Sequence, residues 1–132
     1  MEYPGAVALT PVLAGSQEAR GMWGMIAKIT VLPSKRDEMI EILRESAANM
    51  PRCLSYVVAK DAADEKIERS NAEAHTIWVT EVWDSMANHD ASLSLPAVKN
   101  SIPRGKAAVS NFERIAVTNP VWGAGLATAK AH

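Results

Sequence analysis

The chain has 132 residues, 48% of them hydrophobic and 22% charged, a balance typical of one compact globular domain. The formal net charge of −1 gives no indication of a nucleic-acid-binding surface, and no apolar run approaches the roughly 20 residues of a membrane span. Cys53 is the only cysteine, so an internal disulfide is excluded, and the usual His/Cys zinc spacings are absent. The N-terminus does not resemble a signal peptide, so we expect a soluble, cytoplasmic protein with no metal and no membrane contact.

The first half of the chain predicts an arm, a strand and a helix. Residues 1–21 contain two prolines and three glycines without periodicity, which predicts an N-terminal arm. Apolar residues then alternate through Met22–Leu32, the pattern of a strand. Ser34 is a suitable N-cap for a helix over Lys35–Asn49, and Pro51 ends it.

Two further strands follow, separated by a long polar connection. Leu54–Lys60 and Thr76–Trp83 carry the apolar residues expected of strands, but neither face of the second segment is cleanly polar. The connection Asp61–Ala74 is long enough to suggest a functional loop, although a tolerated surface insertion is the simpler interpretation.

The last third of the chain predicts a capped helix, a short helical piece and a final strand. Ser85 caps the helix, and Pro96 breaks or redirects it. Val98–Ile102 forms the short piece, which Pro103 ends, and Asn111–Thr118 is the fourth strand. The domain therefore covers residues 22–120, and residues 121–132 form a C-terminal tail.

The predicted order is β-α-β-β-α-β, a ferredoxin-like α+β arrangement with a four-stranded antiparallel sheet and helices on one face. The other face is also largely apolar and needs a cover. A second copy of the chain, packed face to face about a two-fold axis, covers it most economically, so we expect a homodimer.

Several segments carry a family resemblance. They are Cys53-Leu54-Ser55-Tyr56, Thr80-Glu81-Val82-Trp83-Asp84-Ser85, His89-Asp90-Ala91-Ser92-Leu93 and Leu95-Pro96-Ala97-Val98, with a weaker match through Ile102, Phe112 and Pro120-Val121-Trp122-Gly123. In these residues the chain resembles the antibiotic-biosynthesis-monooxygenase domain family, in its quinol monooxygenase subgroup. The resemblance covers roughly residues 22–125.

The resemblance implies a dimeric α/β barrel. It also implies a monooxygenase (an oxidoreductase) that oxidises a quinol, phenol or anthrone-like aromatic with dioxygen, without metal or flavin. The partners would be a small aromatic substrate, dioxygen and a second copy of the chain. One fold hosts many functions, so two alternatives stay open. One is a non-catalytic dimer that binds a small molecule, and the other is an isomerase or decarboxylase on the same scaffold.

His89 is the candidate catalytic base, because the unperturbed pKa of histidine lies near neutrality. Met86, His89 and Leu93 share one side of the predicted helix, so the imidazole should be buried. A buried histidine whose hydrogen bonds are all satisfied is the competing interpretation.

Five further residues are candidates for substrate binding. The indoles of Trp83 and Trp78 could stack on an aromatic ring or simply pack in the core. Ser92 could bind a substrate oxygen or bond back to its own helix. Glu81 is a second acid/base group or a paired structural charge, and Arg104 binds an anionic substituent or lies in solvent.

Overall fold

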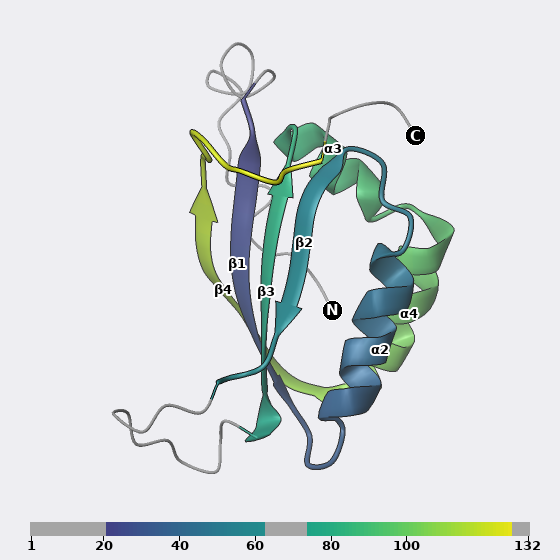
Figure 1. Cartoon of the computed structure of the whole chain (residues 1–132). Coiled ribbons are helices and arrows are strands. Elements are labelled where there is room, and N and C mark those ends of the chain that lie inside the picture. Colours follow the sequence, from purple (N-terminus) through teal and green to yellow (C-terminus); the bar gives the residue numbers. More distant parts are fainter. Residues whose placement is uncertain (1–20, 63–73, 128–132) are drawn as a thin grey trace.

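The computed structural model describes residues 21–62 and 74–127, with elements labelled as in Figure 1. The strands are β1 (Trp23–Val31), β2 (Cys53–Ala59), β3 (Thr76–Trp83) and β4 (Val109–Thr118), and the helices are α2 (Arg36–Ala47), α3 (Met86–Ser92) and α4 (Pro96–Ala108). The antiparallel sheet has the order β2-β3-β1-β4. This confirms the ferredoxin-like α+β fold, with two helices instead of one after β3.

The core lies between the sheet and the helices, since α2 and α4 pack side by side against one face of the sheet (Figure 1). Side chains alternate across a strand, so the odd-numbered residues of β1 and β3 face the helices. Met25, Ile29, Ile77 and Trp83 on this inner face are at most 1% exposed. The alternation also places Glu81 on the inner face, opposite Met25.

Two helix starts behave differently. Ser85 caps α3 as predicted, because its Oγ accepts a hydrogen bond from the backbone N–H of Asn88 at 3.2 Å. The prediction for Ser34 was wrong. Lys35 is the N-cap of α2 and makes no side-chain cap bond, while Ser34 adopts a left-handed φ of 65° in the preceding turn. The turn is closed by a backbone bond from Lys35 to Leu32, and it fixes the start of the helix.

Helix α4 is longer than the short piece that the sequence predicts, and Pro103 lies inside it instead of ending it. Pro96 starts the helix, where no backbone N–H is needed. An internal proline removes a helical hydrogen bond at a cost of about 3 kcal/mol. Burial offsets this cost, because Val98, Ser101, Gly105 and Ala108 form a stripe of small residues on the buried side of α4.

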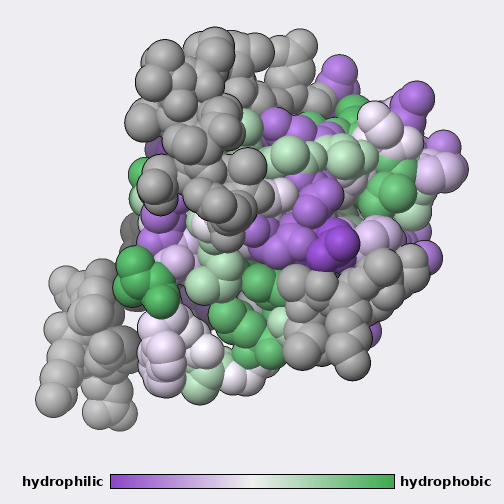
Figure 2. Space-filling model, turned by 90° about the horizontal axis from the view of Figure 1, so that it is seen from above, coloured by the Kyte–Doolittle hydropathy of each residue, from purple (hydrophilic) through white to green (hydrophobic). Residues whose placement is uncertain are grey.

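The chain after β4 returns across the end of the sheet to the opposite edge (Figure 1). The backbone N–H of Ala127 donates to the carbonyl of Leu54 at 3.0 Å. Seen from above, the surface at this end of the molecule has a central cluster of hydrophilic side chains, with smaller patches of hydrophobic side chains beside it (Figure 2). Val121 and Trp122 in the tail are 94% and 81% exposed. The predicted N-terminal arm and most of the 61–74 connection lie outside the described residues.

Candidate active site

A small, partly enclosed cavity of about 40 Å³ lies between the sheet and all three helices. Its apolar wall comes mainly from α2 and α4, with Met39, Ile42, Leu43, Val98 and Ile102. Its polar groups are Glu81, His89, Tyr56 and the three serines Ser46, Ser92 and Ser101. An apolar space with a few convergent polar groups is the usual composition of a ligand site.

Two indoles hold the imidazole of His89 in place. The short helix α3 carries His89 into the core, where its side chain is 2% exposed. Its ring lies 4.3 Å from the ring of Trp23 between centroids, at an interplanar angle of 34°. The ring of Trp83 meets it edge-on at 5.5 Å and 82°. With both sides packed, the imidazole has little freedom to rotate, so its nitrogens keep fixed directions.

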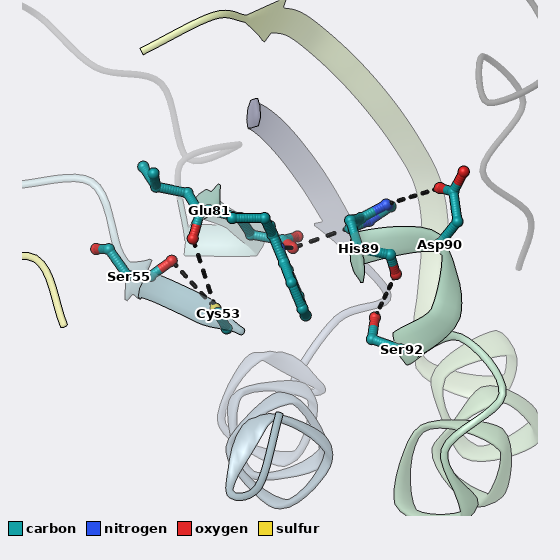
Figure 3. A network of polar contacts seen from close by, with 8 residues as sticks. Cys53, Ser55, Glu81, His89, Asp90 and Ser92 are labelled. Carbon is teal, nitrogen blue, oxygen red and sulfur yellow. Dashed lines mark hydrogen bonds and ion pairs between the residues drawn. The ribbon is translucent and has the colours of Figure 1, made fainter. Parts of the chain in front are cut away.

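The contacts of His89 favour one neutral tautomer. Nδ1 lies 3.0 Å from Oδ1 of Asp90, and an ionised carboxylate can only accept, so Nδ1–H donates to Asp90. Burial lowers the pKa of His89 below its usual 6.5, and the bond to Asp90 opposes this only in part. The unprotonated Nε2 faces Oε1 of Glu81 at 4.0 Å (Figure 3). The ring therefore presents a basic nitrogen beside the cavity.

Glu81 is a buried carboxyl that is partly protonated near neutral pH. Burial raises the pKa of Glu81 to about 7, although the bond from Trp83 and the charge of Arg114 act in the opposite direction. The donor in that bond is Nε1–H of Trp83, 2.9 Å from Oε1 of Glu81. A neutral imidazole and a carboxyl that can still donate a proton thus border the same cavity.

The hydroxyl of Ser92 lines the cavity but donates its proton to its own helix. Oγ of Ser92 donates to the carbonyl of His89 at 2.6 Å (Figure 3), which is the back-bond considered above. Ser46 and Ser101 donate to carbonyls three residues earlier in the same way. Because their protons are engaged, these three hydroxyls offer acceptor oxygens to a ligand.

The other predicted binding residues do not line the cavity. Trp83 lies behind it, fully buried, and holds Glu81 and His89. Trp78 points to the outer face of the sheet, where its Nε1–H donates to Asp61 at 3.0 Å and Lys28 lies over its ring. Arg104 is half-exposed and pairs with Glu45 of α2 at 2.7 Å. The structure thus brings His89, Glu81 and Ser92 together, and it places Trp78 and Arg104 elsewhere.

Cys53 is not an activated thiol. Burial raises its pKa to about 11, and the nearby charge of Glu81 acts in the same direction. Its Sγ points at the carbonyl of Ser55 at 3.4 Å (Figure 3) and at that of Val82 at 3.8 Å. A thiol in such surroundings stays protonated and is a poor nucleophile.

Sequence reasoning missed Arg114 as a member of this site. Arg114 pairs with Ala27 across β1 and β4, and its guanidinium lies 5.9 Å from the ring of Trp23. Its positive charge lowers the pKa of both Glu81 and His89. A signal was present, because Arg114 lies two residues after the inward-facing Phe112 on β4 and therefore shares its face. Nothing in the sequence predicted the hydrogen bond between His89 and Asp90, since adjacent residues of a helix do not normally face each other.

Within residues 21–62 and 74–127, no group of three His, Cys, Asp or Glu side chains could hold a metal ion. In the same residues, no helix is long and apolar enough to cross a membrane.

Comparison with known proteins identifies the family. Residues 22–104 match the family described as Antibiotic biosynthesis monooxygenase, and the chain belongs to it. A search of curated proteins finds no match. The chain is similar to a crystal structure from Chloroflexus aurantiacus that is named for the same family, with 44% identity, 80% of this chain and 99% of the other covered, and a TM-score of 0.62.

Two more distant structures share the fold. A protein of Caulobacter crescentus, also named for this family, is 23% identical, with 78% of this chain and 92% of the other covered and a TM-score of 0.60. SnoaB of Streptomyces nogalater, a cofactor-independent oxygenase, is 14% identical, with 79% and 97% covered and a TM-score of 0.58.

The raised pKa of Glu81 predicts a loss of stability as pH rises. Between about pH 4.5 and 7 the folded protein retains a proton that the unfolded chain releases, so the free energy of unfolding falls over this window. From about pH 5 to about pH 8, we expect wild type to lose about 2–3 kcal/mol more than Glu81→Gln, measured by urea unfolding. If wild type and Glu81→Gln showed the same pH dependence of the free energy of unfolding, the burial of an ionisable Glu81 would be contradicted. Glu113→Gln, which removes an exposed carboxylate, is the control and should behave as wild type.

Proposed function

We propose that the protein is a cofactor-independent monooxygenase that oxidises a phenol, quinol or anthrone-like aromatic with dioxygen. The observation that carries the proposal is the pairing of a neutral imidazole with a partly protonated carboxyl beside one largely apolar cavity. Membership of a family named for monooxygenation supports it. The similarity of the fold to SnoaB, an oxygenase without cofactor, is consistent with it.

Deprotonation of the substrate is the first step. Nε2 of His89 takes the proton of a phenol, or of the acidic carbon of an anthrone, and leaves an electron-rich anion. The Asp90 carboxylate, which accepts from Nδ1–H at 3.0 Å, stabilises the imidazolium that forms. Trp23 and Trp83 keep the ring in the direction that this transfer requires.

Oxygenation then needs no bound metal or flavin. The anion passes one electron to dioxygen, and the resulting radical and superoxide combine into a peroxide. The new carbon–oxygen bond forms at the deprotonated carbon of an anthrone, or at a ring carbon of a phenol that carries hydrogen. The carbon–hydrogen bond and the oxygen–oxygen bond then break, water leaves, and a carbonyl remains. For an anthrone, one dioxygen yields one quinone and one water. Protonated Glu81 is placed to give the proton that the leaving hydroxide needs.

Replacing His89 with alanine should abolish catalysis. Oxygen uptake by purified protein is followed over a panel of hydroquinones and anthrones. We expect His89→Ala to lose at least 100-fold in rate, the usual contribution of a general base. His75→Ala is the matched control, because His75 directly precedes β3, at the end of that strand away from His89. Uptake equal to buffer with wild type would contradict the function on those substrates. Substrate consumed without oxygen uptake would instead indicate an isomerase or decarboxylase.

The outer face of the sheet supports a homodimer as part of the same proposal. Val57 on this face is 51% exposed, and Ile26, Trp78 and Val82 are only half-buried beside it. Polar Thr80 and Lys28 interrupt this face, but its exposed and half-buried apolar side chains still favour a partner. A face-to-face dimer covers it in both copies at once.

Light scattering on a sizing column tests this dimer. Wild type should have twice the chain mass of 14.2 kDa. Val57→Lys should shift the mass toward that of one chain, because the new charge would be buried at the interface. Ala107→Lys, at an exposed position of α4, should leave the dimer intact. A monomeric wild type, or a dimer unaffected by Val57→Lys, would contradict the proposed interface.

A further inference from the structure

The cavity is too small for the substrate that the proposed function requires. A cavity needs about 10–15 Å³ to hold one water molecule, so the 40 Å³ beside His89 has room for only a few waters. Sites for organic ligands usually measure about 300–1,000 Å³. An aromatic ring can therefore reach Nε2 of His89 only if one wall of the cavity moves.

A wider apolar groove lies on the other side of one wall. It runs between α2 and the edge strand β2 and measures about 380 Å³. Ile40, Ala47, Ala48 and Val58 line it together with Tyr56, and Arg44 is its only charged member. The groove is wider and more open to solvent than the cavity, so a dissolved aromatic can enter it without any rearrangement.

Tyr56 separates the two spaces. Among the described residues, it alone borders the cavity, the groove and a further surface recess near Cys53 and Ala127. It lies directly opposite Glu81 in the β2–β3 register, so a ligand that passes it meets the Glu81 carboxyl. Displacement of the Tyr56 ring would join the two spaces.

The other walls do not separate the cavity from the groove. Met39 and His89 are at most 2% exposed, within the close-packed core. The half-buried Leu43, Met50, Leu93 and Ile102 line the cavity but not the groove. Tyr56 is only half-buried and belongs to β2, an edge strand that pairs with β3 alone. Tyr56 packs against the core from the edge of the sheet, so displacement of its ring breaks this packing but no pairing between strands.

We propose that Tyr56 is the gate of the reaction cavity and the residue that sets the size of accepted aromatics. The substrate enters from the α2–β2 groove by displacing the Tyr56 ring. Its reacting ring comes to lie in the widened cavity beside both Glu81 and His89, and a second ring stays in the groove against Ile40 and Val58. This inference rests on the proposed function for the nature of the ligand, but not for the route.

Binding kinetics test the gate without turnover. The full chain is mixed with phenol or 2-naphthol under anaerobic conditions, and association is followed by stopped-flow fluorescence. We expect Tyr56→Ala to raise the association rate of 2-naphthol at least 10-fold and that of phenol much less, because a small residue leaves the entrance open. Tyr56→Phe, of nearly the same size, should behave as wild type, and Tyr56→Trp should slow 2-naphthol. Urea unfolding confirms that each variant is folded.

Ile102→Ala is the matched control, because Ile102 is a half-buried residue that lines the cavity from α4 but does not border the groove. It should not accelerate association. Acceleration by Ile102→Ala and not by Tyr56→Ala would overturn the gate, as would a failure of 2-naphthol to bind both wild type and Tyr56→Ala. A gate effect without oxygen uptake would retain the entrance and reject the monooxygenase. Oxygen uptake without any effect of Tyr56→Ala on association would retain the monooxygenase and reject the gate.

Discussion

The burial of Glu81 beside His89 is the constraint on which the rest of the site depends. Removing a carboxyl from water disfavours its charged form, and removing an imidazole from water disfavours its protonated form. Burial therefore raises the pKa of Glu81 and lowers that of His89. Both shifts favour the uncharged groups, so the pair can remain in an apolar core without a full ion pair. The same shifts create one group able to accept a proton and one able to donate it.

The fold holds this pair with ordinary devices. Strand alternation turns Glu81 toward the helices, and the Ser85 cap starts α3 at the point that brings His89 over the end of the sheet. Trp83, two residues after Glu81 on the same face, bonds the carboxyl and packs against the imidazole. One short segment from β3 to α3 therefore supplies both reacting groups and much of their support. The distant strand β4 adds the charge of Arg114.

The sequence predicted what depends on local pattern and missed what depends on packing between distant segments. Period-two alternation and the Ser85 cap were enough to identify the strands, the fold and the inward direction of Glu81 and His89. The length of α4 was not predictable from Pro103, because contact with α2 outweighs the local cost of the proline. Alternation places Trp78 and Glu81 on opposite faces of β3. Because both faces are apolar, the sequence alone does not show which of the two faces borders the cavity. The place of Tyr56 between cavity and groove depends on where α2 packs, which no local pattern encodes.

The protonation of Glu81 is the most direct test of this account. The carboxyl carbon of Glu81 can be followed by ¹³C NMR over a pH titration of the labelled full chain, with Glu81→Gln providing the assignment. The account predicts a midpoint near the value of about 7 that burial produces. A midpoint near the ordinary 4.5 would mean that the carboxyl is solvated and charged at neutral pH. The proton donor, and with it the chemistry proposed for the cavity, would then be lost.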